Sequence, residues 1–215
     1  MRRVLLCVLS LCFVGSLSAS PITYSVTVNT SSVSGSTGSL DFNFNPGPVI
    51  TQSASLQMLK FGNDGTLTGS PTLTGDVSGT LPSTVTFENG TGFNDYFEDF
   101  TYGSTLSFDV NLYGPALSSP DEVSTSGSAF AFSMFSDAAG TMPALTTDTT
   151  NGFAVTIDVN LDGTTTVNNF STQATVTPLT SSVPEPSTLT LFGIAGVVAI
   201  AFVRVRRFFS DPRSV

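Results

Sequence analysis

Residues 106–112, Leu-Ser-Phe-Asp-Val-Asn-Leu, alternate apolar and polar side chains along their whole length. A period of two places the four apolar residues on one face of an extended chain, which is the pattern of a half-buried β-strand. Gly114-Pro115 follows and ends the segment, because proline lacks the N–H that a continuing strand would donate. This stretch predicts a β fold.

The same alternation recurs between Pro21 and Thr180. It predicts further strands around these sets of residues: Ile22, Tyr24, Val26 and Val28; Leu40, Phe42 and Phe44; Ala54, Leu56 and Met58; Val85 and Phe87; Phe130, Phe132 and Met134; Phe153, Val155, Ile157 and Val159; Thr165 and Val167; and Thr172 to Thr177, ending at Pro178. The pattern slips at Leu59 and Phe61, which predicts a β-bulge. The strand around Phe132 is apolar on both faces, so we expect it to be central.

Thirteen of the 18 phenylalanines lie in this body, enough for a core, and Thr, Ser, Asn and Gly fill most other positions. About nine short strands without a helical period predict an all-β fold, an antiparallel β-sandwich of jelly-roll-like type. An immunoglobulin-type sandwich is the alternative, although this body contains neither the Trp nor the Cys pair typical of it.

Residues 1–19 have the composition of a secretory signal peptide. Arg2 and Arg3 precede an apolar segment, and small residues follow that allow cleavage after Ser18 or Ala19. We therefore expect export through the Sec translocon and removal by signal peptidase. Both cysteines lie in the segment removed, which excludes disulfides and thiolate chemistry from the mature chain.

The other end of the chain carries three features in a fixed order. A short stalk, residues 179–183, leads to an extended strip with two prolines and one carboxylate, consisting of Val183, Pro184, Glu185, Pro186 and Ser187. An apolar run at 188–203 is predicted to be a transmembrane helix, because it is apolar all round. The basic residues after it would lie on the cytoplasmic side and stop the span; these are Arg204, Arg206 and Arg207. Residues 208–215 would form a cytoplasmic tail.

This order of strip, span and arginine cluster over 184–207 resembles the PEP-CTERM sorting signal of exported proteins in Gram-negative bacteria. The resemblance implies an exosortase as processing partner, an inner-membrane precursor with a periplasmic ectodomain, and delivery to the cell surface or extracellular matrix. Segments 26–44 and 75–97 are also similar to an uncharacterised domain that recurs among such proteins, which implies no known activity.

The predicted ectodomain, residues 20–178, is strongly acidic. It holds fourteen Asp and Glu residues and a single base, Lys60, whereas the whole chain has a net charge of −9 because most arginines lie in the targeting segments. Such a charge repels nucleic acid and anionic membrane surfaces, so neither is an expected partner of this domain.

Asp158, Asn160 and Asp162, followed by Gly163, match the first half of a calcium loop. The last position of that loop should carry an acid, but Asn169 stands there, and the flanking segments alternate as strands. The alternative is a type I′ hairpin turn at Asp162-Gly163. We therefore expect no cofactor and keep these three residues as weak calcium candidates.

A second acidic cluster lies among aromatic residues and consists of Glu88, Asp95, Glu98 and Asp99. It would suit a carboxylate pair for glycoside hydrolysis or a cation site, but the plainer interpretation is a solvated loop. With no histidine and no mature cysteine, nucleophilic catalysis and zinc binding lack their usual residues. The chain is therefore predicted not to be an enzyme.

The sequence predicts a surface or extracellular-matrix structural protein, associated with biofilm or exopolysaccharide. The alternative is a polysaccharide-binding module, with calcium dependence as one form of it. Tyrosine rings that could stack on sugars are few: Tyr24, Tyr96, Tyr102 and Tyr113.

Overall fold

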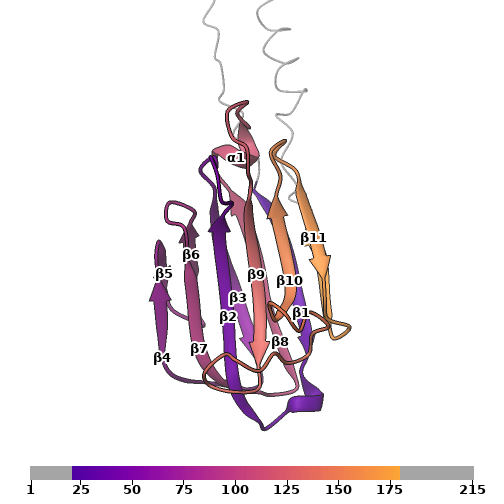
Figure 1. Ribbon diagram of the computed structural model, residues 1–215. Helices are drawn as coiled ribbons and strands as arrows, with labels where there is room; N and C mark the ends of the chain where they lie inside the picture. Colours follow the sequence, from indigo (N-terminus) through magenta and orange to yellow (C-terminus); the bar gives the residue numbers. More distant parts are fainter. Residues whose placement is uncertain (1–20, 180–215) are drawn as a thin grey trace, which may run out of the picture. The chain divides into compact units, whose positions relative to one another are not determined.

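The computed structural model describes residues 21–179, which form two antiparallel sheets. Sheet A contains β12 (Ala174–Leu179), β1 (Ile22–Asn29), β8 (Thr105–Tyr113), β3 (Ser55–Asn63), β6 (Val85–Glu88) and β5 (Val77–Gly79), in that order. Sheet B contains β11 (Thr165–Asn169), β10 (Phe153–Val159), β9 (Ser128–Phe135), β2 (Thr37–Pro46), β7 (Asp95–Thr101) and β4 (Thr66–Thr74). Figure 1 shows sheet B in front of sheet A. The all-β, antiparallel prediction is confirmed.

Helical structure in this part of the chain is limited to two short pieces. A 3₁₀-helix, η1, covers Ser31–Val33, and α1 covers Pro115–Ser118 directly after β8. Pro115 occupies the first helical position, where a backbone N–H would have no acceptor within the helix. The lack of an N–H in proline therefore costs no hydrogen bond there. The break predicted at Gly114-Pro115 is therefore confirmed, and the chain turns there into one helical turn.

The core lies between the inner faces of the two sheets, where the alternation predicted from sequence places the large rings. Phe42 of β2 stacks on Phe132 of β9, with ring centroids 4.9 Å apart. Phe108 of β8, in the opposite sheet, meets the Phe42 ring edge-on at 5.3 Å. All three are at most 1% exposed. Such contacts add about 0.5–1.5 kcal/mol per aromatic pair beyond the area buried, so these rings hold the sheets together.

The pairings among the first eight strands are nested. β1 pairs with β8, β2 with β7, and β3 with β6, as in a long hairpin folded over on itself. β9, β10 and β11 extend sheet B beyond β2, and β12 extends sheet A beyond β1. The strand around Phe132, β9, lies inside sheet B between β10 and β2, so the prediction of a central strand is confirmed.

Of two further predictions about the strands, the one about the bulge is correct and the one about the end of the last strand is wrong. The bulge predicted near Leu59 is present, because the register of β3 against β8 shifts between Leu59 and Gly62, and Lys60 adopts a φ of 51° there. The last strand does not end before Pro178, since β12 continues to Leu179. β12 is an edge strand of sheet A. On the side without a neighbouring strand, a proline that lacks an N–H interrupts no hydrogen bonds between strands.

β4 and β5 were not predicted from the sequence, and the segment that forms β7 was predicted to be a loop. β7 is instead an internal strand of sheet B, between β2 and β4, with Tyr96 and Phe100 buried in the core. Glu98 occupies the inward position between Tyr96 and Phe100, so a charged residue interrupts the apolar alternation by which the other strands were recognised. The loop interpretation of this segment was therefore wrong.

Candidate functional site

The outer face of sheet B carries a row of amide and acid side chains on β2. Because Leu40, Phe42 and Phe44 point into the core, the residues between them, Asp41 and Asn43, point outward, and Asn45 follows on the same face. The strand therefore separates a fully apolar inner row from a fully polar outer row.

A groove of about 670 Å³ lies over this face. On β9, next to β2, the outward residues are Ala129 and Ala131, and on β10 they are Thr156 and Asp158. The two alanines are short compared with their neighbours on both sides. We will call the hollow above them the sheet B groove.

One wall of the groove comes from the connection between β9 and β10, residues 136–152. Backbone hydrogen bonds tie this connection to its surroundings, for example from the Thr147 N–H to the Phe170 carbonyl at 2.8 Å. The Ser39 hydroxyl donates to the carbonyl of Asp137 at 2.9 Å. The connection thereby brings Asp148 and Asn151 to the groove.

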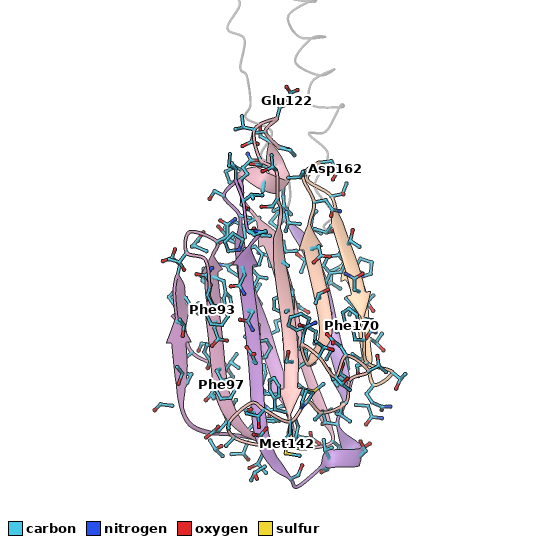
Figure 2. The ribbon with its side chains drawn as sticks, in the orientation of Figure 1. Phe93, Phe97, Glu122, Met142, Asp162 and Phe170 are labelled. Carbon is cyan, nitrogen blue, oxygen red and sulfur yellow. The ribbon has the colours of Figure 1, made fainter. Side chains whose placement is uncertain are left out.

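Three phenylalanines line the same groove: Phe93, Phe153 and Phe170. Figure 2 shows Phe93 and Phe170 on opposite flanks of the face, with β2 and β9 between them. Phe93 is 53% exposed. Its position is fixed by the next residue, buried Asn94, whose side-chain amide donates to the Phe44 carbonyl at 2.9 Å.

Asp41 and Asp95 form a pair of carboxyl groups beside the groove, on adjacent strands. Burial, together with the hydrogen bond and the charge of Asp95, raises the pKa of Asp41 to about 8. Burial also raises the pKa of Asp95. Ionising both carboxyl groups of such a close pair is unfavourable, because the two negative charges repel each other. The pair therefore holds one proton at neutral pH.

The other groove carboxylates, Asp148 and Asp158, accept hydrogen bonds. Asp148 accepts hydrogen bonds from the backbone N–H groups of Thr150 and Asn151, which lower its pKa. Asp158 accepts a hydrogen bond from the side-chain amide of Asn168 at 3.1 Å.

Polar atoms without a partner also occur at this site. Asn43 is 8% exposed and lines the groove; its amide nitrogen donates to Asp41 at 2.6 Å, but its Oδ1 has no hydrogen bond. One oxygen of Asp95 is unpartnered as well. Buried acceptors without donors are uncommon in folded proteins and indicate a missing donor.

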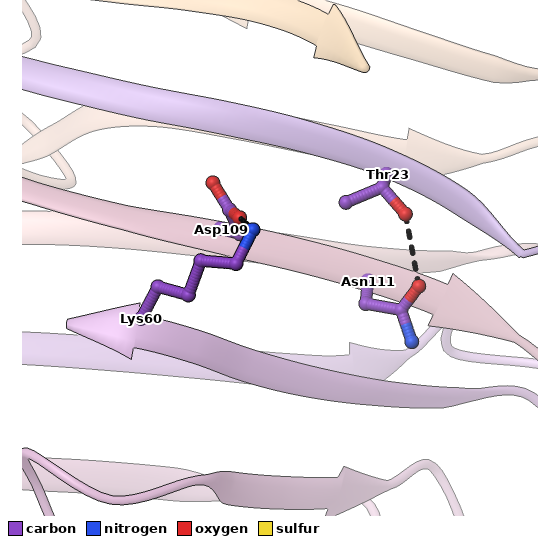
Figure 3. Close-up of polar contacts among 4 residues, drawn as sticks. All are labelled: Thr23, Lys60, Asp109 and Asn111. Atoms are coloured by element: carbon purple, nitrogen blue, oxygen red, sulfur yellow. Dashed lines mark hydrogen bonds and ion pairs between the residues drawn. The ribbon is translucent and has the colours of Figure 1, made fainter. Parts of the chain in front are cut away.

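Within residues 21–179, no basic side chain faces these acids. Lys60 is the single Lys or Arg between residues 21 and 179, and it lies on β3 in the other sheet. Figure 3 shows its ammonium paired with Asp109 of β8, at 2.9 Å. On the same face Thr23 donates a hydrogen bond to Asn111 at 2.9 Å. The sheet B groove therefore keeps an uncompensated negative charge.

The structure places the weak calcium candidates on the β10–β11 hairpin. The Asp162 carboxylate accepts from the N–H and hydroxyl of Thr164, and the Asn160 amide donates to Thr164 and Thr166. Asp158 lies apart from them, in the groove. Within residues 21–179 no group of three or more His, Cys, Asp or Glu side chains is arranged to hold a metal ion.

The predicted hairpin between β10 and β11 is confirmed, but the prediction that its turn is of type I′ is wrong. A type I′ turn needs positive φ at two central residues, whereas here only Gly163 has one, at 79°. The Asn160 N–H donates to the Thr164 carbonyl, and the Gly163 N–H donates to the Asn160 carbonyl. This is a three-residue loop with a glycine bulge, the next most common hairpin connection.

The acidic cluster of the sequence analysis does not form one site. Glu88 belongs to β6 in sheet A, whereas Asp95, Glu98 and Asp99 belong to β7 in sheet B. Alternation along β7 sends Asp95 and Asp99 outward and Glu98 inward. Glu98 is 4% exposed and accepts a hydrogen bond from the Tyr96 hydroxyl.

The tyrosines considered for sugar stacking are mostly unavailable. Tyr96 and Tyr102 are buried, and Tyr24 and Tyr113 are half-buried. The rings at the groove are instead the phenylalanines Phe93, Phe153 and Phe170. A signal for Asp41, Asn43 and Asn45 was present in the sequence, because all three alternate with the apolar residues of one predicted strand.

The predicted sorting residues, Val183 to Ser187, and the arginine cluster, Arg204 to Arg207, lie outside the described residues, as do the signal peptide and the predicted transmembrane span. Between residues 21 and 179, no helix has the length and apolar character needed to cross a membrane.

In the comparison with protein families, residues 182–207 match the PEP-CTERM protein-sorting motif. Comparisons with curated proteins and with solved structures found no match for the chain.

Proposed function

Since the PEP-CTERM protein-sorting motif at residues 182–207 marks the chain as an exported substrate of an exosortase, we propose that the protein is a structural component of the cell surface or extracellular matrix of a Gram-negative bacterium. In this proposal the precursor enters through the Sec translocon, loses its signal peptide, and is held in the inner membrane with residues 20–178 in the periplasm. Exosortase processing then delivers the β-sandwich outward, into a biofilm or exopolysaccharide matrix. The sorting motif is the observation that carries this proposal.

We also propose that the sandwich belongs to the jelly-roll type. The nested pairing of β1 with β8, β2 with β7 and β3 with β6 supports this topology. β5 departs from it by pairing with β6 in sheet A.

The proposed role involves no catalysis and no cofactor. Glycosidases separate their two carboxyl groups by roughly 5 Å or more, so that a sugar or a water lies between them. Asp41 and Asp95 instead lie on adjacent strands, so close that Asp95 raises the pKa of Asp41. Release of the aryl group from any member of an aryl-glycoside panel by the purified protein would contradict this part of the proposal.

A second candidate function is polysaccharide binding, and the sheet B groove is the observation that favours it. An open hollow on a sheet face, with rings at both flanks and amides and carboxylates between them, suits a chain of sugar rings. Binding that depends on calcium is one form of this candidate. A glycan array, read with and without a calcium chelator, separates a binding module from a purely structural protein.

The sorting step is tested by Glu185→Ala, which removes the only charge from the extended strip. The expected result is full-length protein that stays in the inner-membrane fraction, read by immunoblotting of cell fractions. Glu122→Ala, the same change at an exposed loop position of the sandwich, should be processed like the unaltered protein. Normal processing of Glu185→Ala would contradict the proposed role of the strip.

A further inference from the structure

We propose that the sheet B groove binds an oligosaccharide that carries free, protonated amino groups. The inference rests on the polysaccharide-binding candidate above and names the class of sugar. It is independent of which enzyme sorts the protein.

Charge is the first argument. Asp41, Asp95, Asp148 and Asp158 lie in or beside the groove, and the pair Asp41–Asp95 holds one proton between its two members. The groove therefore carries about three negative charges, with no basic group among its lining residues. An acidic polysaccharide such as a polyuronate would be repelled, whereas ammonium groups would supply the missing positive charge.

The spread of these charges is the second argument. No three acids among residues 21–179 converge on a point where one metal ion would sit. The carboxylates that line the groove instead come from β2, β10 and the β9–β10 connection, and Asp95 of β7 lies beside it. Charges distributed over several strands match an extended ligand with a cationic group on successive units.

The third argument comes from the unpartnered side chain of Asn43 and from the phenylalanine rings at the groove. The Oδ1 of Asn43, a side chain that is 92% buried and lines the groove, lacks a donor that a sugar hydroxyl or ammonium group would provide. Phe93, Phe153 and Phe170 offer flat apolar surfaces for the C–H faces of pyranose rings. A simple cation would use the carboxylates but not these rings.

A basic peptide is the main rival, and the position of the groove disfavours it. Extended peptides usually bind at the edge of a sheet, where unpaired backbone groups continue the ladder. This groove lies over β9 and β2, which are paired on both sides. A peptide there would find few partners for its own backbone N–H and C=O groups, whereas the hydroxyls of a sugar can use the amide and carboxyl side chains.

The test is titration calorimetry of the full-length protein, purified in detergent, with four oligomers of equal length. These are oligomers of glucosamine, of N-acetylglucosamine, of glucose, and of lysine, at a pH where the amines are protonated. The glucosamine oligomer should bind at least about tenfold more tightly than its acetylated counterpart, because a hydrogen bond to a charged group contributes about 1.5–3 kcal/mol.

Variants locate the binding and supply the control. Asp158→Asn and Asp148→Asn, at two carboxylates that line the groove, should each reduce affinity for the glucosamine oligomer about tenfold, with little change for the neutral ones. Asp99→Asn removes the same charge from the outer face of β7, four residues beyond Asp95 and outside the groove, and should bind normally. If all three variants weaken binding equally, overall charge and not the groove is responsible, and the site assignment is wrong.

The remaining outcomes are distinct. Equal binding of acetylated, neutral and amino sugars would overturn the amino-sugar inference but leave polysaccharide binding intact. Oligolysine binding as tightly as the amino sugar would show a site for cationic chains in general, which also overturns the inference. Binding of none of the four oligomers would overturn both the inference and the polysaccharide-binding candidate.

Discussion

Three carboxyl groups of this protein have unusual surroundings, and each follows from its position on a strand. Asp41 and Asp95 share a proton on the outer face of sheet B, and Glu98 lies on the inner side of β7. Burial raises the pKa of all three. Each therefore contributes to stability in its protonated form and opposes folding when ionised.

Because of Asp41, the free energy of unfolding should fall as the pH rises above about 4. Its pKa is about 8 in the folded state and about 4 in the unfolded chain, so the folded protein binds a proton that the unfolded chain releases. The contribution is complete below pH 4 and is lost by pH 8, at a slope of up to about 1.4 kcal/mol per pH unit. Urea unfolding at several pH values between 5 and 8 measures it.

In Asp41→Asn this decline should become shallower, and Asp99→Asn should keep it. Asp95 and Glu98 contribute in the same direction, so some decline is expected to persist. Acids with lowered pKa values, such as Asp137 and Asp148, act below about pH 4 and do not interfere in this window. The same slope in Asp41→Asn and in the unaltered protein would contradict the proton-sharing pair.

Tyr96 provides a second prediction about a single side chain. Its hydroxyl donates to Glu98 and accepts from the Leu81 N–H at 3.1 Å, in a buried location that water does not reach. Tyr96→Phe leaves both partners unsatisfied and should lower the free energy of unfolding by about 1–3 kcal/mol.

The matched control is Tyr24→Phe, because the Tyr24 hydroxyl bonds to Thr165 at a half-buried position where water can replace it. Tyr24→Phe should lower the free energy of unfolding by clearly less than Tyr96→Phe does, and chemical denaturation measures both variants. A loss in Tyr24→Phe as large as in Tyr96→Phe would show that burial of the Tyr96 network is not what makes it important.

Among the strands and turns, regular alternation determined what could be predicted. β2, β8 and β9 were recognisable because their inward residues are uniformly apolar, and even the β3 bulge was visible as a slip in the pattern. β4 consists mainly of Thr, Gly, Ser and Leu, with little apolar contrast between its faces. Edge strands of this composition cannot be told from loops by periodicity alone.

The groove was harder to predict than the strands, because it depends on which strands are neighbours. Asp41 and Asp95 are far apart in sequence and meet because Asn43 pairs with Asp95 in the register of β2 against β7. The wall that carries Asp148 comes from a connection whose path across the sheet has no signature in the sequence. Alternation predicts which side chains point outward, but not which of them meet.

The β10–β11 hairpin gives a prediction at the level of an element. Gly163 has a φ of 79°, and a Cβ at this position would lie 2.7 Å from Cγ of Pro120. Gly163→Ala should therefore destabilise the protein by about 1–2 kcal/mol, from left-handed strain and crowding. Gly92→Ala, at a position with open space and no positive φ, is the matched control and should change stability little. Equal melting temperatures for the two variants would contradict this account of the turn.

The whole chain combines two kinds of segment with separate tasks. The ends carry six of its seven basic residues and, in our proposal, direct export and retention, whereas the acidic sandwich presents the groove. The sequence alone identified the sorting signal, because its three parts are contiguous. What the sandwich binds depends on side chains brought together from distant strands.

The most direct test of the central claim is mass spectrometry of the exported protein, recovered from the medium or cell surface, to define both ends of the mature chain. The account predicts a chain that begins just after Ser18 or Ala19 and ends near Val183 to Ser187, without peptides from the apolar run or from Arg204 to Val215. An exported protein that still contains residues 188–215 would contradict it.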